Sequence, residues 1–139
     1  MKVLVPVDGS EYSLKAVESA CDLAKTQPFS TLILLSVCIQ MPELEEGRYI
    51  AEKMKAQAEA ALAKAKEVAV SKEPRLKVDT ILATGSSPAE EIVQVAKDEK
   101  IDLIVIGSRG LASKTKSFLG STASKVVTYS PCSVLVVKI

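Results

Sequence analysis

Five short runs of hydrophobic residues recur along the chain, and each has the length of a β-strand. Most are continuously apolar and rich in β-branched residues, which is typical of strands buried on both faces of a parallel sheet. The third run partly alternates with polar residues, so we expect it to be less buried, at an edge of the sheet. The predicted strands cover residues 2–7, 31–39, 77–83, 102–107 and 133–139.

Between these runs, apolar residues recur every three or four positions, which predicts helices that place one face on the sheet. Ser10 and Ser87 precede two of these helices as N-caps, and Pro88 with Glu90 completes a capping box in the second. The acidic segment 41–49 is predicted to be an exposed loop or an irregular helix start. The predicted helices cover residues 10–26, 48–71, 87–100 and 121–129.

The longest predicted helix carries a narrow apolar stripe made mostly of alanine. Such small residues favour close packing on a sheet and argue against a coiled coil. In the last helix, we expect Ala123, Val126 and Val127 to face the core. The stripe of the longest helix consists of Ile50, Met54, Ala58, Ala61, Leu62, Ala65, Val68 and Ala69.

Strands and helices alternate through the whole chain. This order predicts an α/β fold in three layers, a doubly wound parallel sheet with helices on both faces and right-handed crossovers. A length of 139 residues suits a single domain, which we place at residues 1–139.

The composition argues against nucleic acid and membrane partners. Aromatic residues make up 4% of the chain, tryptophan is absent and the net charge is +1, so neither base-stacking platforms nor a basic surface is expected. No apolar run reaches 18 residues, and the first run is too short for a signal peptide. Three scattered cysteines, Cys21, Cys38 and Cys132, favour a cytoplasmic protein with reduced thiols.

The absence of histidine removes several kinds of chemistry. Nucleophile systems that depend on histidine and a histidine general base are excluded. A zinc site would have only the three scattered thiols and carboxylates as ligands.

A glycine-rich loop follows the fourth predicted strand. Gly107 ends the strand, Gly110 comes three residues later, and Gly120 stands next to Ser121 and Thr122 where the last helix begins. Backbone N–H groups of such a loop and helix start can point at an anion, and glycine lets a ligand approach the main chain. Two glycines alone also occur in ordinary turns, and Ser121 could serve only as an N-cap.

Topology brings a second group of residues to this loop. If the first strand lies between the second and the fourth, Asp8 and the loop meet at the carboxyl ends of the strands, where ligands bind in doubly wound sheets. Asp8 could then accept from a ribose hydroxyl or hold Mg²⁺ through water, or could simply cap its own turn. Arg109 supplies a charge for a phosphate. Lys114 and Lys116 are expected to be solvated.

The spacing Gly107-x2-Gly110-x9-Gly120-Ser121 resembles the nucleotide signature of the universal stress protein family. The stretches VLVPVDGSE, GSSPAEEIV, DLIVIGSRG and PCSVLVV also occur in that family's order. The resemblance covers the whole chain and implies a five-stranded parallel sheet in the order 3-2-1-4-5. It also implies a homodimer in which the last strand, from Ser133 to Ile139, pairs antiparallel with its twin, which would cover a hydrophobic edge.

The resemblance further implies ATP as the ligand, with Mg²⁺. Carried over by position, residues 6–8 line the adenine and ribose side, and Val37 meets the adenine through its backbone. Residues 107–110 wrap the ribose and phosphates, and residues 120–122 hold the phosphates. Ala123 departs from the pattern, because many members have a hydroxyl there, which puts one phosphate contact in doubt. The implied nucleotide-binding residues are Pro6, Val7, Asp8, Val37, Gly107, Ser108, Arg109, Gly110, Gly120, Ser121 and Thr122.

These residues predict a cytoplasmic ATP-binding dimer that acts as a nucleotide-dependent regulator or stress-resistance factor. The loop lacks the lysine of a P-loop and no general base stands near Gly120, so ATP hydrolysis should be slow or absent and the protein is not expected to be an enzyme. The alternative is a partner-binding module that acts through the dimer and residues 41–50, with nucleotide incidental. A receiver domain is excluded because the third strand ends without an acceptor Asp. An ATP pyrophosphatase would need a glycine-rich Ser/Asp loop after the first strand, which residues 8–11 do not supply.

Overall fold

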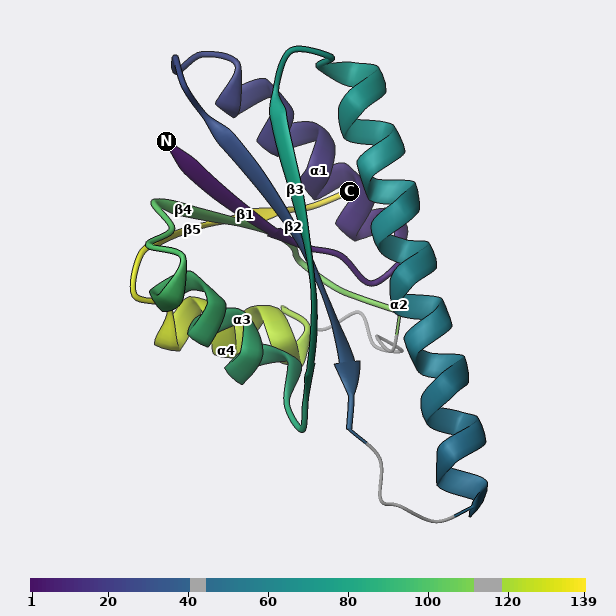
Figure 1. Cartoon of the computed structure of the whole chain (residues 1–139). Helices are drawn as coiled ribbons and strands as arrows, with labels where there is room; N and C mark the ends of the chain where they lie inside the picture. Colours follow the sequence, from purple (N-terminus) through teal and green to yellow (C-terminus); the bar gives the residue numbers. More distant parts are fainter. Residues whose placement is uncertain (41–44, 112–118) are drawn as a thin grey trace.

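The computed structural model describes residues 1–40, 45–111 and 119–139, for residues 45–49 as backbone only, and shows a doubly wound sheet (Figure 1). The sheet has five strands in the order β3-β2-β1-β4-β5, and all neighbouring strands are parallel, as predicted. The elements in chain order are β1 (Lys2–Pro6), α1 (Glu11–Ala24), β2 (Thr31–Ile39), α2 (Glu45–Lys72), β3 (Lys77–Gly85), α3 (Pro88–Asp98), β4 (Leu103–Gly107), α4 (Ser121–Tyr129) and β5 (Ser133–Val137).

Two helices cover each face of the sheet, with α1 and α2 on one side and α3 and α4 on the other (Figure 1). Alternate residues of one strand pack against the helix layers on opposite faces of the sheet, because successive side chains of a strand point to opposite faces. In β1, Val3 and Val5 pack with α1 and α2, whereas Leu4 packs with α3 and α4. All three are completely buried, as expected for a central parallel strand.

The strand register leaves an opening at the carboxyl end of β1. Pro6, the last residue of β1, pairs with Leu35, whereas β2 continues to Ile39 and pairs with β3 along all nine residues. The central strand β1 therefore ends earlier than its neighbour β2, and the chain can form loops above β1.

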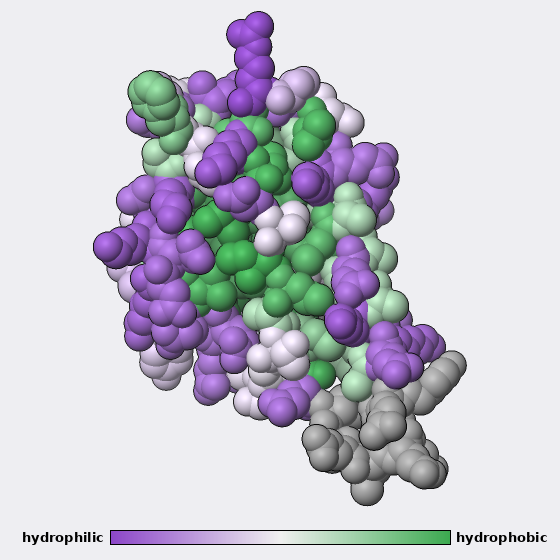
Figure 2. Space-filling model, in the orientation of Figure 1, coloured by the Kyte–Doolittle hydropathy of each residue, from purple (hydrophilic) through white to green (hydrophobic). Residues whose placement is uncertain are grey.

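The edge strand β3 confirms the prediction of a less buried strand. Val78, Ile81, Leu82 and Ala83 are half-buried. Figure 2 shows hydrophobic side chains gathered in the middle of this face, over the sheet edge that β3 forms in Figure 1.

The alanine stripe of α2 packs as predicted along its second half only. Ala58, Ala61, Ala65 and Ala69 are buried, but Ile50 is 42% exposed, so its predicted burial is wrong. A helix of 28 residues is about 42 Å long, whereas the nine residues of β2 span about 30 Å. The first turns of α2 consequently run past the carboxyl ends of the strands (Figure 1). The helix begins at Glu45, earlier than predicted, and residues 41–44 lie outside the described residues.

The inward face of α4 is narrower than predicted. Ala123 and Val126 are buried among α3–α4 core residues, but Val127 is 46% exposed. One helical step turns a side chain by about 100°, so Val127 points away from the line of Ala123 and Val126.

The three cysteines are free thiols, and Cys21 and Cys38 are buried. Burial raises the pKa of the Cys21 thiol, although the nearby Lys72 opposes this effect. In the described part of the chain, no helix is long and apolar enough to span a membrane.

Candidate nucleotide-binding site

The site lies where β1 and β4 end side by side in the middle of the sheet. Val7 continues β1 by one hydrogen bond, since its N–H donates to the Leu35 carbonyl at 2.7 Å. The chain then turns away through Asp8 and Gly9. Gly9 has a φ of 88°, in the left-handed region that favours glycine. This turn leads directly into α1 and leaves the Asp8 carboxylate beside the loop that follows β4.

The Asp8 carboxylate joins two segments that are distant in sequence. Its Oδ1 accepts from Ser10 N–H at 2.9 Å, which closes its own turn. Its Oδ2 accepts from Leu111 N–H at 3.0 Å, which ties the end of β1 to the glycine loop. The structure therefore brings Asp8 and the loop together as the topology required, and Asp8 also caps its own turn.

Gly107 is a glycine because α1 lies directly on it. A Cβ atom at this position would lie 2.8 Å from Tyr12 Cβ and 2.9 Å from the backbone C and O atoms of Tyr12. The close contact is with protein backbone, which cannot move without shifting α1. The fold alone therefore accounts for this glycine of the predicted signature.

Ser108 connects the loop to the two elements that follow it. Its N–H donates to the Val137 carbonyl at the end of β5, and its carbonyl accepts from Gly120 N–H, both at 2.8 Å. Ser108 is buried. Because its N–H and carbonyl both have protein partners, the backbone of Ser108 fixes the loop, and its side-chain hydroxyl is the group left for a ligand.

In the part of the chain that the structure describes, no side chain caps the start of α4. Gly120 is the N-cap residue, and a Cβ there would lie 3.3 Å from Arg109 Cα and from the Ser108 carbonyl oxygen. Ser121 is the first helical residue and is exposed, so the alternative that it serves as the N-cap is wrong. The first turn carries no acidic residue. The N–H groups of the first turn lack partners within the helix and, with the positive end of the helix dipole, suit an anion.

Ala123 lies at the base of this helix start and is 3% exposed. It packs in the α3–α4 core, whereas the next residue, Ser124, is exposed. The position that often carries a hydroxyl in the resembling family is therefore filled by core packing, and Ser124 faces a different direction.

The remaining predicted residues lie near the same carboxyl ends of the strands. Pro6 is the last residue of β1 and pairs with Leu35 of β2. Val37 lies two residues beyond Leu35 on β2. Both are half-buried, and the Val37 side chain packs against the α3–α4 core. Arg109 and Thr122 are half-buried at the loop and at the start of α4. Lys114 and Lys116 lie outside the described residues.

Three residues that the sequence did not indicate help to form this site. Leu111 donates its N–H to Asp8, Tyr12 packs on Gly107, and Val137 accepts from Ser108. Leu111 and Val137 act entirely through backbone atoms. Side-chain type carries no signal for such contacts, so sequence patterns could not have identified them.

The described residues contain no group of three or more Cys, Asp or Glu side chains that could hold a metal ion. A carboxylate has about four lone-pair positions, so each Asp8 oxygen keeps one after its backbone hydrogen bond. Asp8 alone does not form a metal centre, and Mg²⁺ would need most of its ligands from water and phosphate.

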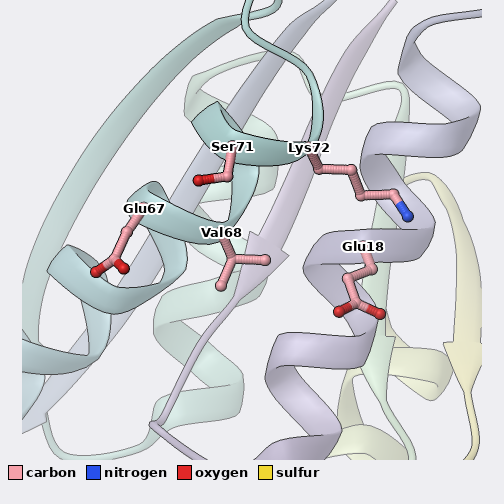
Figure 3. A pocket seen from close by; sticks show the side chains of 5 residues that line it. All are labelled: Glu18, Glu67, Val68, Ser71 and Lys72. Atoms are coloured by element: carbon pink, nitrogen blue, oxygen red, sulfur yellow. The ribbon is translucent and has the colours of Figure 1, made fainter.

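A separate hollow of about 310 Å³ lies between α1 and α2 (Figure 3). It is lined by Glu18 of α1 and by Glu67, Val68, Ser71 and Lys72 of α2. None of these residues belongs to the glycine loop or to the start of α4. The hollow lacks converging backbone N–H groups, and we do not assign the nucleotide to it.

Comparison with known proteins agrees with this fold along the whole chain. The Universal stress protein family matches residues 1–138. A universal stress protein of Bacillus subtilis is 36% identical over 151 residues, which cover 99% of this chain and 98% of that protein.

Two solved structures share the fold closely. A universal stress protein of Lactobacillus plantarum superposes with a TM-score of 0.82 at 29% identity, covering 99% of this chain and 97% of that one. A universal stress protein in complex with cAMP superposes with a TM-score of 0.76 at 28% identity, covering 99% and 96%. With its sheet order, its glycine spacing and these matches, the chain belongs to the universal stress protein family.

Proposed function

We propose that this protein binds ATP above β1 and β4 and acts in the cytoplasm as a nucleotide-dependent regulator or stress-resistance factor. The observation that carries the proposal is that Asp8, the glycine loop and the start of α4 meet at the carboxyl ends of β1 and β4. The similar protein that was crystallised with cAMP supports an adenine nucleotide as the ligand.

The helix start and the adjoining loop are suited to the phosphates. The first-turn N–H groups of α4, together with the hydroxyls of Ser121 and Thr122, supply hydrogen-bond donors, and Arg109 supplies positive charge. Gly120 lets a phosphate approach the backbone because no side chain covers it. Pro6 and Val37 offer half-buried apolar surface for the adenine side of the nucleotide.

The proposal includes a homodimer formed through β5. This strand is an open sheet edge in the single chain, next to β4 alone. Its Leu135 is 39% exposed, and Val127 and Tyr129 of the neighbouring α4 are 46% and 69% exposed. A second copy that pairs with β5 would cover these side chains and the free edge.

We propose that the bound ATP is hydrolysed slowly or not at all. The glycine loop supplies no P-loop lysine, and the chain contains no histidine. Both oxygens of Asp8 already accept backbone hydrogen bonds, which leaves this carboxylate poorly disposed to activate a water molecule. The site is therefore suited to sensing a nucleotide rather than consuming it.

Isothermal titration with ATP and Mg²⁺ tests the proposal. We expect saturable binding below millimolar ATP, and turnover well below about one per second, the low end of ordinary enzymes. Absence of binding at millimolar ATP would remove the proposal. Several turnovers per second, lost in Asp8→Ala, would contradict the claim of slow hydrolysis.

A further inference from the structure

We propose that Asp8 is a positioning residue, whose carboxylate holds the backbone of Gly110 and Leu111 in the conformation that receives the nucleotide. In this role Asp8 contacts neither the ribose nor a metal ion. The inference rests on the proposed function, because it concerns how the same site reaches its binding conformation.

Both carboxylate oxygens of Asp8 accept hydrogen bonds from protein N–H groups. Ser10 N–H orients Oδ1 from the turn, and Leu111 N–H donates to Oδ2 from the loop, 103 residues away. Asp8 N–H in turn lies 3.4 Å from Ser13 Oγ, which fixes the backbone of Asp8 on α1. The turn thus presents the carboxylate to the loop from a rigid base.

The close approach of Gly110 to Asp8 explains the second glycine of the signature. A Cβ atom at Gly110 would overlap Asp8 Oδ2, and the next nearest atom is Asp8 Cγ at 3.6 Å. No other atom group of the described residues obstructs a side chain there. Gly9 is the described glycine with a left-handed φ, so backbone conformation does not require glycine at position 110.

The other two glycines of the signature differ in this respect. Gly107 contacts the backbone of Tyr12, and Gly120 contacts the backbone of Ser108 and Arg109. Gly110 meets only the carboxylate of Asp8. The two residues therefore form one unit, in which the missing side chain of Gly110 leaves room for the hydrogen bond between Asp8 and Leu111.

A double-mutant cycle for ATP binding tests this unit. Asp8→Ala removes the acceptor, and Gly110→Ala displaces the carboxylate with a methyl group, so each should weaken ATP binding about tenfold. The double variant should bind no more weakly than Asp8→Ala alone. The matched control is Asp102→Ala, because Asp102 accepts the Lys2 N–H at 2.8 Å at the opposite end of the sheet. It should leave ATP affinity unchanged.

Two further measurements separate positioning from direct contact. The tenfold loss in Asp8→Ala should be the same with Mg²⁺ and with EDTA, and the same for ATP, 2′-deoxy-ATP and 3′-deoxy-ATP. In nucleotide-free protein, hydrogen exchange followed by NMR should show a slowly exchanging Leu111 amide that exchanges faster in Asp8→Ala and in Gly110→Ala. Spectra of each variant report whether it is folded.

The results that overturn the inference are distinct from failure of the proposed function. A loss that disappears with EDTA would make Asp8 a metal ligand, and one that disappears with a deoxy nucleotide would make it a ribose contact. Additive losses, or an unchanged Leu111 exchange rate in Asp8→Ala, would overturn the positioning role while ATP binding remains. If the unmodified protein binds no ATP, the proposed function fails, and this role of Asp8 fails with it.

Discussion

The helices α1 and α4 both begin beside the candidate site, but their first turns are completed in different ways. In α1, the Ser10 hydroxyl accepts from Ser13 N–H at 3.2 Å, and Glu11 places a negative charge in the first turn. In α4, Gly120 offers no side chain and the first turn has no acidic residue. The described residues thus supply a cap and a negative charge at the positive end of α1 and neither at the start of α4, which makes the start of α4 suited to an external anion.

The two helices are also attached to the sheet differently. Tyr12 of α1 lies against Gly107 without space for one extra carbon atom. The start of α4 is attached by a backbone hydrogen bond from Gly120 to Ser108. The first helix start is therefore part of the packed core, and the second is part of the site.

The largest effect on stability is expected from Gly107→Val, which tests how closely α1 packs on Gly107. The added side chain must displace the backbone of Tyr12, so we expect the free energy of unfolding to fall by about 3 kcal/mol. Urea unfolding measures it. Gly110→Ala is the control, since its obstacle is a side chain, and it should cost less than about 1 kcal/mol. Equal losses in the two variants would contradict the distinction between core and site.

The next effect concerns the open start of α4. Gly120→Asp supplies the missing acidic cap, which should compete with phosphate and weaken ATP binding by at least about tenfold. The new Cβ requires only a small shift of Ser108 and Arg109. Titration calorimetry measures the affinity, and Ser86→Asp, an exposed position before α3, controls for added charge. Unchanged affinity in Gly120→Asp would mean that the phosphates do not bind at α4.

A smaller effect is expected at the capped helix. Ser10→Ala removes the N-cap of α1 and should lower the free energy of unfolding by about 1 kcal/mol. Thermal or urea unfolding checks this value. Ser87→Ala in α3 should cost somewhat less, because its bond to Glu90 N–H is longer, at 3.4 Å. A null result for Ser10 would show that its cap adds little to packing.

The smallest effect on stability is expected from Ser121→Ala. Ser121 is exposed and is not a cap, so the free energy of unfolding should change by less than about 0.5 kcal/mol. ATP affinity should nevertheless fall, since a phosphate would lose one hydroxyl donor, by about fivefold. A loss of stability as large as that of Ser10→Ala would indicate that Ser121 caps the helix after all.

Sequence patterns predicted the architecture because the hydrophobicity of side chains and their spacing along strands and helices can be read from the sequence. Continuous apolar runs predicted the strands, the family resemblance implied their order, and that order placed Asp8 beside the glycine loop. Helix periodicity predicted which side of α2 faces the sheet. It could not predict how far the sheet extends, and Ile50 is exposed for that reason.

Other features depend on backbone contacts and leave no pattern. β3 continues to Gly85 because Thr84 and Gly85 pair with Cys38 and Ile39, although glycine is a turn-forming residue type. The reason for glycine at position 107 is the backbone of Tyr12, which any residue type would have provided. The sequence thus predicted that Asp8 and the glycine loop meet, which the structure confirms, whereas the reason for each glycine lies in the atoms packed against it.

The hydrogen bond from Ser108 to Val137 gives the end of β5 an influence beyond the sheet edge. Val137 is the last residue of β5. Proteolytic loss of Val137 would leave the buried Ser108 N–H without its acceptor, while β1, β2, β3 and β4 would still pair with one another. Shortening β5 would therefore disturb the glycine loop before it unfolded the domain, and proteolytic trimming at β5 should be avoided when nucleotide binding is measured.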